Sequence, residues 1–167
     1  SSEPWPAPKR DPRDPAMTKE QDDGSKAVVD KESIKGGGHR ALLASRPSGD
    51  IKESDFKTVE EPIPEPGPKE VLVKVIYISL DPTHRLWASE QPQYMPCVGI
   101  DHCMRASVIG KVVKSSSGKW KEGTYCGGMG GVQEYFLAPE ESIYPIIPGV
   151  PLPLNLSLFN VVIGLTA

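Results

Sequence analysis

One run of residues constrains the fold more than any other: residues 70–80, EVLVKVIYISL, in the middle of the chain. Its valines alternate with Leu72, Ile76 and Ile78, so that both faces of an extended segment are largely apolar. β-branched residues favour strands, and a strand that is apolar on both faces is covered on both sides. A proline-rich approach with a turn at Gly67 precedes the run. The run therefore predicts a long strand buried at the centre of a sheet.

Shorter extended segments surround this strand. The chain holds 18 prolines and 16 glycines in 167 residues, a content that suits a β-rich fold with irregular connections. Gly110 predicts a bulge or a close approach of two backbones, and Asp81-Pro82 predicts a turn. Further extended segments are expected within residues 39–47, 55–64, 105–116, 123–139 and 141–153. A helix is expected only after Asn155, so the order predicts a mainly β, barrel-like domain over residues 39–155 with a helix behind it.

The first 38 residues have a different composition. They mix charges of both signs with proline, serine and a glycine run. Such a segment buries too little apolar surface to offset the entropy lost on ordering, so we expect residues 1–38 to form a disordered tail. We interpret its single Trp5, in PWPAP, as incidental rather than as a docking motif.

Charge, hydropathy and cysteine content limit the classes of partner and the cellular location that we expect for this chain. The net charge of −3 gives no reason to expect a polyanion, so neither nucleic acid nor an acidic membrane surface is an expected partner. The longest mostly apolar run contains Lys74 and falls well short of the about 20 residues that a membrane-spanning helix needs. Three cysteines cannot all pair within one chain, which favours reduced thiols. We therefore expect a cytoplasmic protein.

The chain ends in FNVVIGLTA, residues 159–167, which are apolar and at helical spacing with no polar tail behind them. Phe159, Val162 and Ile163 would need a core that the remaining residues do not supply. We expect the sequence to stop within a helix, as half of a larger enzyme would.

Four blocks carry a resemblance to a known family: LASRPSGDIKESDF, ISLDPTHRLW, MRASVIGKVVKS and GGVQEYFL. With the closing GLTA, they resemble the N-terminal catalytic domain of the medium-chain dehydrogenase/reductase superfamily. The branch they look most like is the zinc-independent one of prostaglandin, leukotriene and 2-alkenal reductases. The resemblance implies a GroES-like, partly open β-barrel over residues 39–155. It also implies that residues 156–167 start a helix toward a Rossmann domain that this sequence lacks.

The same resemblance implies an activity: NADPH-dependent reduction of the C=C bond of α,β-unsaturated aldehydes or ketones, without a metal. The present chain would contribute one wall of the substrate cleft, while the cofactor carries the chemistry. On its own, the chain is expected to be inactive.

Residue by residue, the resemblance places Thr83, Met129 and Gly130 near the substrate. It places near the nicotinamide ring Val162, Gly164 and Thr166. It implies no certain catalytic residue, because Thr83 stands where many relatives have a tyrosine, and threonine reaches less far. Arg85 matches a family arginine, which we interpret as a salt bridge or a carbonyl cap on the turn. His84 replaces an apolar residue and receives no role.

Two other patterns in the sequence resemble a metal site and a phosphate loop. Asp101, His102 and Cys103 stand together, but the cysteines lack Cys-x2-Cys spacing, and no cysteine follows the central strand as it does in zinc-dependent relatives. A turn beside a buried cysteine is therefore expected there, with no metal. The glycine run 127–131, GGMGG, lacks the Lys-Ser/Thr of a phosphate loop and is expected to connect strands along the cleft.

A second function belongs to another class: a stand-alone, non-catalytic barrel that binds a partner or a small ligand. The apolar face at Phe159 and Val162 would then be a docking surface, with a homodimer as one outcome. Micromolar binding of NADPH by the chain would oppose both this module and the simple reductase half, and would indicate that a dimer completes a site.

Overall fold

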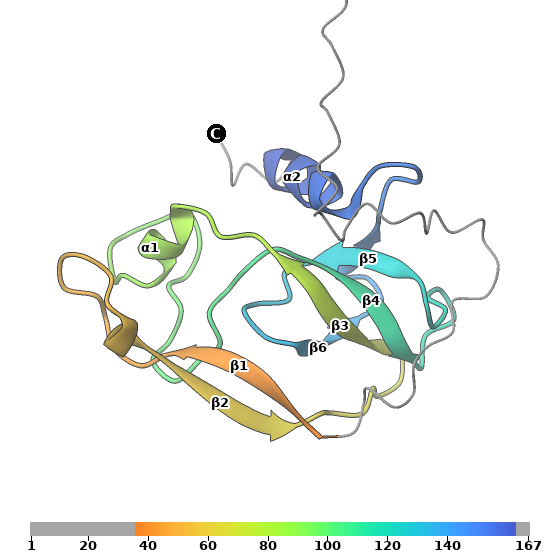
Figure 1. The fold of residues 1–167 in the computed structure, drawn as a ribbon, viewed down its shortest axis with the longest axis horizontal. Helices are drawn as coiled ribbons and strands as arrows, with labels where there is room; N and C mark the ends of the chain where they lie inside the picture. Colours follow the sequence, from red (N-terminus) through yellow and green to blue (C-terminus); the bar gives the residue numbers. More distant parts are fainter. Residues whose placement is uncertain (1–35, 163–167) are drawn as a thin grey trace, which may run out of the picture.

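The computed structural model describes the backbone of residues 36–162 and the side chains of residues 36–158. These residues form a five-stranded antiparallel sheet, a two-stranded ribbon and two α-helices (Figure 1). The sheet curls over the ribbon, so the prediction of a mainly β, partly open barrel is confirmed. Most of the expected tail lies outside the described residues. Its last two glycines, Gly37 and Gly38, already belong to the first strand.

The strands of the large sheet lie in the order β6-β3-β4-β5-β7, and each neighbouring pair is antiparallel. Their bounds are β3 Glu70–Ile78, β4 Val108–Ser115, β5 Tyr125–Gly128, β6 Tyr135–Pro139 and β7 Ile143–Pro145. β3 therefore lies inside the sheet, as predicted, with β6 on one side and β4 on the other.

Only the first half of β3 is the buried strand that its sequence predicts. Residues 71–73 are fully buried, whereas Ile76 is 44% exposed and Ile78 36% exposed. The ladder with β6 covers only the first half, and the ladder with β4 shifts register between Val75 and Tyr77. The second half of the strand thus extends past the packed part of the sheet, which leaves its isoleucines at the surface.

Gly110 allows the close approach of strands that its position in β4 predicts. A Cβ at this residue would lie 2.5 Å from the carbonyl oxygen of Lys74 and 2.5 Å from Cγ1 of Val73. Because no side chain fits in that space, glycine lets β3 and β4 pair at this point.

The ribbon closes one side of the barrel. It consists of β1 Gly37–Leu43 and β2 Phe56–Pro62, and the 3-10 helix η3 Glu53–Asp55 precedes β2. The free edge of β1 forms bridges from Arg40 to Gln133 and from Leu42 to Cys103. The ribbon is therefore joined to the segments that precede β4 and β6 (Figure 1).

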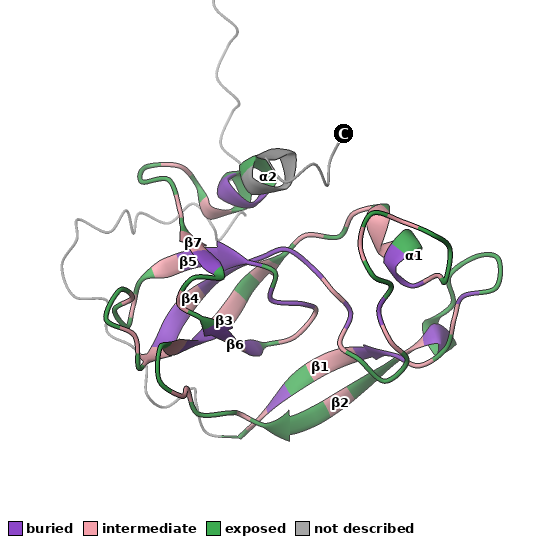
Figure 2. Ribbon diagram, turned by 180° about the vertical axis from the view of Figure 1, so that it is seen from behind, coloured by how far each residue is buried: buried purple, intermediate pink, exposed green. Residues whose placement is uncertain are grey.

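Apolar clusters cover both faces of the sheet. One gathers around Val73 and Phe136, and another on the opposite face of β3 around Leu72 and Val113. The two exist because neighbouring residues of a strand point to opposite faces. Figure 2 shows the buried residues concentrated along β4, β5 and β6. A third cluster, around fully buried Trp87, lies apart from the sheet and holds the short helix α1.

The two helices are α1 Thr83–Trp87 and α2 Leu152–Val162. α1 is the single helical turn expected after Asp81-Pro82. α2 begins before Asn155, earlier than predicted, with Pro153 inside its first turn. Proline is tolerated there because the first N–H groups of a helix have no intrahelical partner in any case. Within residues 36–162, no helix has the length and apolar character needed to cross a lipid bilayer.

Candidate functional site

The ends of three strands and the turn before α1 meet at one end of the large sheet. Ser79, just after β3, donates its backbone N–H to the carbonyl oxygen of Ser107 across 2.9 Å. The Ser107 hydroxyl donates to the sulfur of Met129, just after β5, across 3.4 Å. The Ser79 hydroxyl donates to the Asp81 carboxylate across 2.6 Å, which leads into α1. These bonds place Met129 and the α1 turn at the same end of the sheet.

The α1 turn is held by side chains of its own. The backbone N–H of His84 donates to the carbonyl oxygen of Asp81, and the His84 ring nitrogen Nδ1 lies 3.0 Å from the Asp81 backbone nitrogen. Arg85 donates to the backbone oxygens of Pro47 and Gly49 across 3.3 Å and 3.0 Å. Arg85 thus caps carbonyl oxygens, as one of its two interpretations expects, but they belong to the neighbouring loop and not to its own turn. His84, which received no role, fastens the turn.

Thr83 is the first residue of α1 and is half-buried. Its hydroxyl oxygen is buried and has no hydrogen-bond partner within the part of the chain that the structure describes. A threonine hydroxyl can donate one hydrogen bond and accept others. The predicted contact of Thr83 with substrate stays a prediction: its hydroxyl is unpaired among the described residues, but it is also buried.

Met129 and Gly130 are neighbours with different surroundings. The Met129 side chain is 40% exposed, whereas Gly130 is buried. A Cβ on Gly130 would lie 2.5 Å from Cγ2 of Val108 and 2.7 Å from Cε1 of Phe136. Of the two residues predicted to face substrate, Met129 therefore presents a surface, while Gly130 makes room for the core. The glycine run is only partly a connection, since Gly127 and Gly128 belong to β5.

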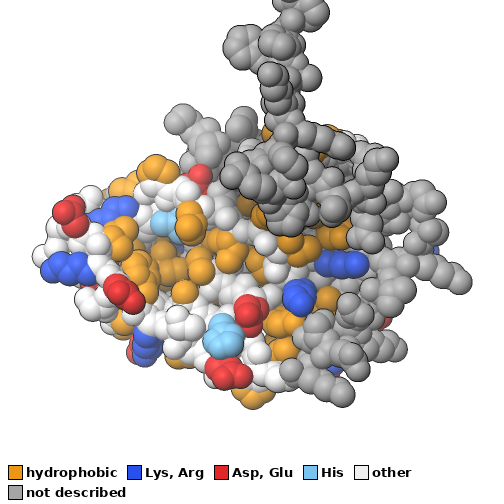
Figure 3. All heavy atoms as spheres, viewed as in Figure 1, with side chains coloured by type: hydrophobic (Ala, Val, Ile, Leu, Met, Phe, Trp, Pro, Cys, Tyr) orange, Lys and Arg blue, Asp and Glu red, His pale blue; other side chains and the backbone are white. Residues whose placement is uncertain are grey.

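An apolar surface extends from this end of the sheet. Five exposed apolar side chains belong to the second half of β3, the segment after it, α1 and the segment after β5, and we call them together the apolar face: Ile76, Ile78, Leu80, Leu86 and Met129. Leu80 is 78% exposed, and several exposed apolar side chains together are more informative than one exposed leucine alone. Figure 3 shows hydrophobic side chains gathered between α1 and α2 on the side of the molecule that carries β3. Thr83, in α1, lies beside this face.

The residues predicted to contact the cofactor lie at or beyond the C-terminal end of the described residues. Val162 is the last described residue of α2, and its side chain is not described. Gly164 and Thr166 lie outside the described residues. Their contact with a nicotinamide stays a prediction.

The side chains that could be considered as zinc ligands, Asp101, His102 and Cys103, have other partners in the structure. Asp101 adopts a left-handed backbone with φ 62° and pairs with Lys57 at 2.6 Å. The His102 ring lies 3.0 Å from the Ile100 carbonyl oxygen, and the Cys103 thiol donates to the carbonyl oxygens of Met104 and Val132. Burial raises the pKa of Cys103, which favours the neutral thiol over the thiolate that binds metal. The described residues contain no group of three His, Cys, Asp or Glu side chains placed to hold a metal ion.

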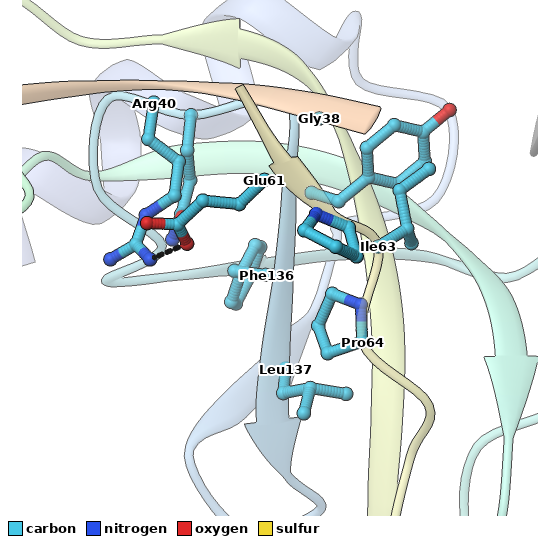
Figure 4. A pocket seen from close by; sticks show the side chains of 10 residues that line it. Gly38, Arg40, Glu61, Ile63, Pro64, Phe136 and Leu137 are labelled. Atoms are coloured by element: carbon cyan, nitrogen blue, oxygen red, sulfur yellow. Dashed lines mark hydrogen bonds and ion pairs between the residues drawn. The ribbon is translucent and has the colours of Figure 1, made fainter. Parts of the chain in front are cut away.

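A groove of about 310 Å³ lies elsewhere, between β1, β6 and the segment after β2 (Figure 4). Arg40 and Glu61 point toward each other on one side of it and form an ion pair of 2.5 Å. Ile63, Phe136 and Leu137 form much of the other side. The lining of the groove is about equally polar and apolar, and the Arg40 charge in it is already paired with Glu61.

Both the sequence and the fold of the chain are similar to those of known proteins. Residues 39–146 match the family described as the N-terminal domain of oxidoreductase. The chain is 33% identical over 104 residues to the NADPH-dependent curcumin reductase of Escherichia coli strain K12, covering 62% of this chain and 30% of that protein.

Solved structures of related proteins share the fold of this chain. CurA from Vibrio vulnificus is 29% identical with a TM-score of 0.64, covering 68% of this chain and 33% of that one. CurA in complex with NADPH, from the same organism, is 28% identical with a TM-score of 0.63 and the same coverage. The chain therefore spans about a third of the length of these relatives.

Proposed function

Because the chain belongs to the N-terminal domain family of oxidoreductases, within the medium-chain dehydrogenase/reductase superfamily, we propose that it forms one wall of a reductase's substrate cleft. The reaction proposed for the whole protein is the NADPH-dependent reduction of the C=C bond of α,β-unsaturated ketones or aldehydes. Support for the cofactor comes from the relatives, which include an NADPH-dependent reductase and a structure solved with NADPH. We propose that the protein works in the cytoplasm, since its three cysteines are free thiols.

The observation that carries the proposal is the apolar face beside Thr83. Ligand sites combine apolar walls with a few placed polar groups, and an enone or enal offers apolar carbon together with one carbonyl oxygen. Met129, Leu86 and the end of β3 supply apolar surface, and the Thr83 hydroxyl has no other acceptor or donor among residues 36–158. The arrangement suits a substrate that is mostly hydrocarbon.

The residues of this chain would act by orientation and polarisation. Thr83 would donate its hydroxyl hydrogen bond to the carbonyl oxygen, where negative charge grows as the double bond is reduced. The apolar face would exclude water and so strengthen that hydrogen bond. NADPH, when bound, would supply the hydride to the β-carbon, and a proton added at the α-carbon would complete the saturated product. No metal is needed in this scheme, because the donor polarises the carbonyl.

The test uses the complete gene product. NADPH consumption is measured with 3-nonen-2-one and with its saturated counterpart, 2-nonanone, and the product is identified by mass spectrometry. We expect NADPH consumption with the enone alone and the saturated ketone as product. Formation of the allylic alcohol would show carbonyl reduction instead and would contradict the proposed reaction.

The second candidate, a binding module, keeps one observation in its favour. Leu154 and Leu158 of α2 are 51% and 40% exposed, so this helix presents apolar surface as well. A second copy of the chain could cover it as a homodimer. A native gene product that neither binds nor consumes NADPH, yet sediments as a dimer, would favour this candidate over the reductase.

A further inference from the structure

The second strand of the ribbon, β2, has a free edge. Figure 1 shows β2 at the margin of the molecule, on the side opposite α2, and Figure 2 shows it as mostly exposed. Among the described residues, β2 pairs with β1 alone. A strand at an edge presents unpaired backbone N–H and C=O groups, which can bond any other strand that aligns with it.

The bonds of β1 show which backbone groups of β2 lie at this edge. Ala41 and Leu43 donate their backbone N–H groups away from β2, across 2.9 Å and 3.0 Å. Successive residues of a strand direct these groups alternately to its two sides, so the residues of β1 that bond β2 are the ones between and beside these two. Ala41 stands opposite Thr58. Thr58 and Glu60 therefore direct their N–H and C=O groups to the free edge.

The sequence of β2 is complementary to a second copy of itself. When two copies run antiparallel with Val59 opposite itself, Thr58 stands opposite Glu60 of the second copy. Both residues direct their backbone groups to the edge, so they can exchange two hydrogen bonds. In the same register, Lys57 stands opposite Glu61 of the second copy, and opposite charges directly across two strands stabilise their pairing. The two-fold symmetry repeats each of these contacts.

The two charged side chains are accessible to a second partner. The Lys57 and Glu61 side chains are each 47% exposed, and each has one ion pair within the chain, Lys57 with Asp101 and Glu61 with Arg40. An ammonium has three donors and a carboxylate has two acceptor oxygens, so each group can bind another charge while it keeps the first. Exposed ion pairs contribute little each, so a contact built on them is reversible.

Charges and proline often protect an edge strand from pairing, and β2 carries both. Charges protect an edge from a second copy when like charges meet across the two strands. In β2 the register with Val59 opposite itself brings unlike charges together instead. Pro62 is the last residue of the strand and lies outside the two residues that would exchange hydrogen bonds. The features that blunt other edges thus leave this one open to its own copy.

We propose that the free edge of β2 is an interface at which two copies of this chain pair, antiparallel and with Val59 opposite itself. A second copy is the partner because β2 supplies both members of each charge pair. The interface lies on the side of the molecule opposite α2, so it is distinct from the surface of that helix considered above (Figure 1). It does not depend on the proposed reaction.

Disulfide cross-linking of the complete gene product tests the register. Val59→Cys places two thiols at a pair without backbone hydrogen bonds, where the Cα atoms lie about 4.5 Å apart, within the reach of a disulfide. Thr58→Cys is the matched control, because its two copies would be diagonal neighbours, about 7–8 Å apart. Thr58 is the more exposed of the two residues, so random collision would favour the control. The wild type accounts for the native thiols, of which Cys97 is exposed.

After mild oxidation and non-reducing electrophoresis, we expect about fivefold more covalent dimer from Val59→Cys than from Thr58→Cys or the wild type. Equal yields from the two variants would mean collision without a fixed register. Dimer from Thr58→Cys alone would mean another register. Either result would overturn the proposal.

A charge exchange separates the contact between copies from the ion pairs within one chain. In the Val59→Cys background, Glu61→Lys sets like charges opposite each other, and we expect the yield of dimer to fall about threefold. Adding Lys57→Glu restores unlike charges between the copies, although it also removes the pairing with Asp101. We expect this exchange to recover most of the yield. An unchanged yield in Glu61→Lys, or a further fall after the exchange, would show that these charges act only within one chain and would contradict the interface.

Discussion

The Ser107 hydroxyl donates a hydrogen bond to the Met129 sulfur across 3.4 Å and so joins the start of β4 to the segment after β5. Ser107 is buried, whereas Met129 is 40% exposed. Methionine is flexible by itself, and this bond restricts where its side chain can lie. The result is an exposed apolar side chain with a fixed position at the end of the sheet that also carries the α1 turn.

Met129→Ala in the complete gene product is expected to raise KM for a long-chain enone about threefold to tenfold, since part of an apolar contact is lost. kcat should change little, because the contact is made equally in the ground state and in the transition state. Steady-state kinetics with long and short enones checks this. Ile51→Ala is the matched control, because Ile51 is 48% exposed and lies outside the apolar face. Equal kinetics in the two variants would remove Met129 from the substrate site.

Gly130→Ala tests whether Gly130, which follows Met129 in the chain, also contributes to the substrate site. The added Cβ would lie 2.5 Å from the Val108 side chain, so we expect a loss of about 1–3 kcal/mol in the free energy of unfolding. Denaturant unfolding of wild type and variant measures it. Gly118→Ala is the control, because a Cβ there would meet nothing within 4 Å. A variant with unchanged stability and a raised KM would instead assign Gly130 to the substrate cleft.

Much of the fold could be predicted from local patterns. The alternation in residues 70–80 predicts β3, and Asp81-Pro82 predicts the turn that starts α1. The exposed end of β3 could not be predicted, because its isoleucines have the same pattern as the buried valines. Their exposure depends on where the ladder with β6 stops, and β6 lies far away in the sequence.

The site was less predictable than the fold. Thr83 and Met129 came from a resemblance, and the structure shows them at one end of the sheet but leaves their contact with substrate untested. The packing around Gly130 depends on residues that are distant in sequence. The one local signal was His84: a histidine three residues after Asp81 can reach back to the backbone of that turn, as it does here.

Removal of metal is expected to change neither the stability nor the activity of the complete gene product. Asp101 pairs with Lys57, and Cys103 has a raised pKa and two carbonyl acceptors, so these side chains are poor ligands as they stand. Dialysis of the complete gene product against EDTA and 1,10-phenanthroline should leave its melting temperature and NADPH consumption unchanged. Activity that is lost on dialysis and restored by Zn²⁺ would contradict the metal-free mechanism.

Asn155 connects α2 to the segment after β7. Its side-chain oxygen accepts the N–H of Ile147 at 2.6 Å, and its amide nitrogen donates to the Val150 carbonyl at 2.9 Å, while the residue is only 3% exposed. Asn155→Ala should cost about 1–3 kcal/mol, because both backbone groups lose a buried partner. Asn155→Asp keeps the acceptor for Ile147 but sets a charged carboxylate against the Ile147 and Val150 carbonyl oxygens in a buried place, so it should lose at least as much at neutral pH. Thermal unfolding ranks the variants, and equal melting temperatures for Asn155→Ala and wild type would show that α2 does not depend on this residue.

Cys126 should make the protein less stable in alkaline solution. Burial raises the pKa of its thiol from 9.0 to about 12, so the folded protein holds this proton where the unfolded chain releases it. Between these two pH values the folded state binds more protons, and the free energy of unfolding therefore falls as pH rises. Tyr144, whose pKa is also raised by burial, adds to the same trend.

Cys126→Ala removes the thiol contribution, so the stability of this variant should fall less steeply with pH than that of the wild type. Guanidinium unfolding at a series of pH values above 9.0 measures both slopes, and identical slopes would mean that Cys126 titrates normally in the folded protein.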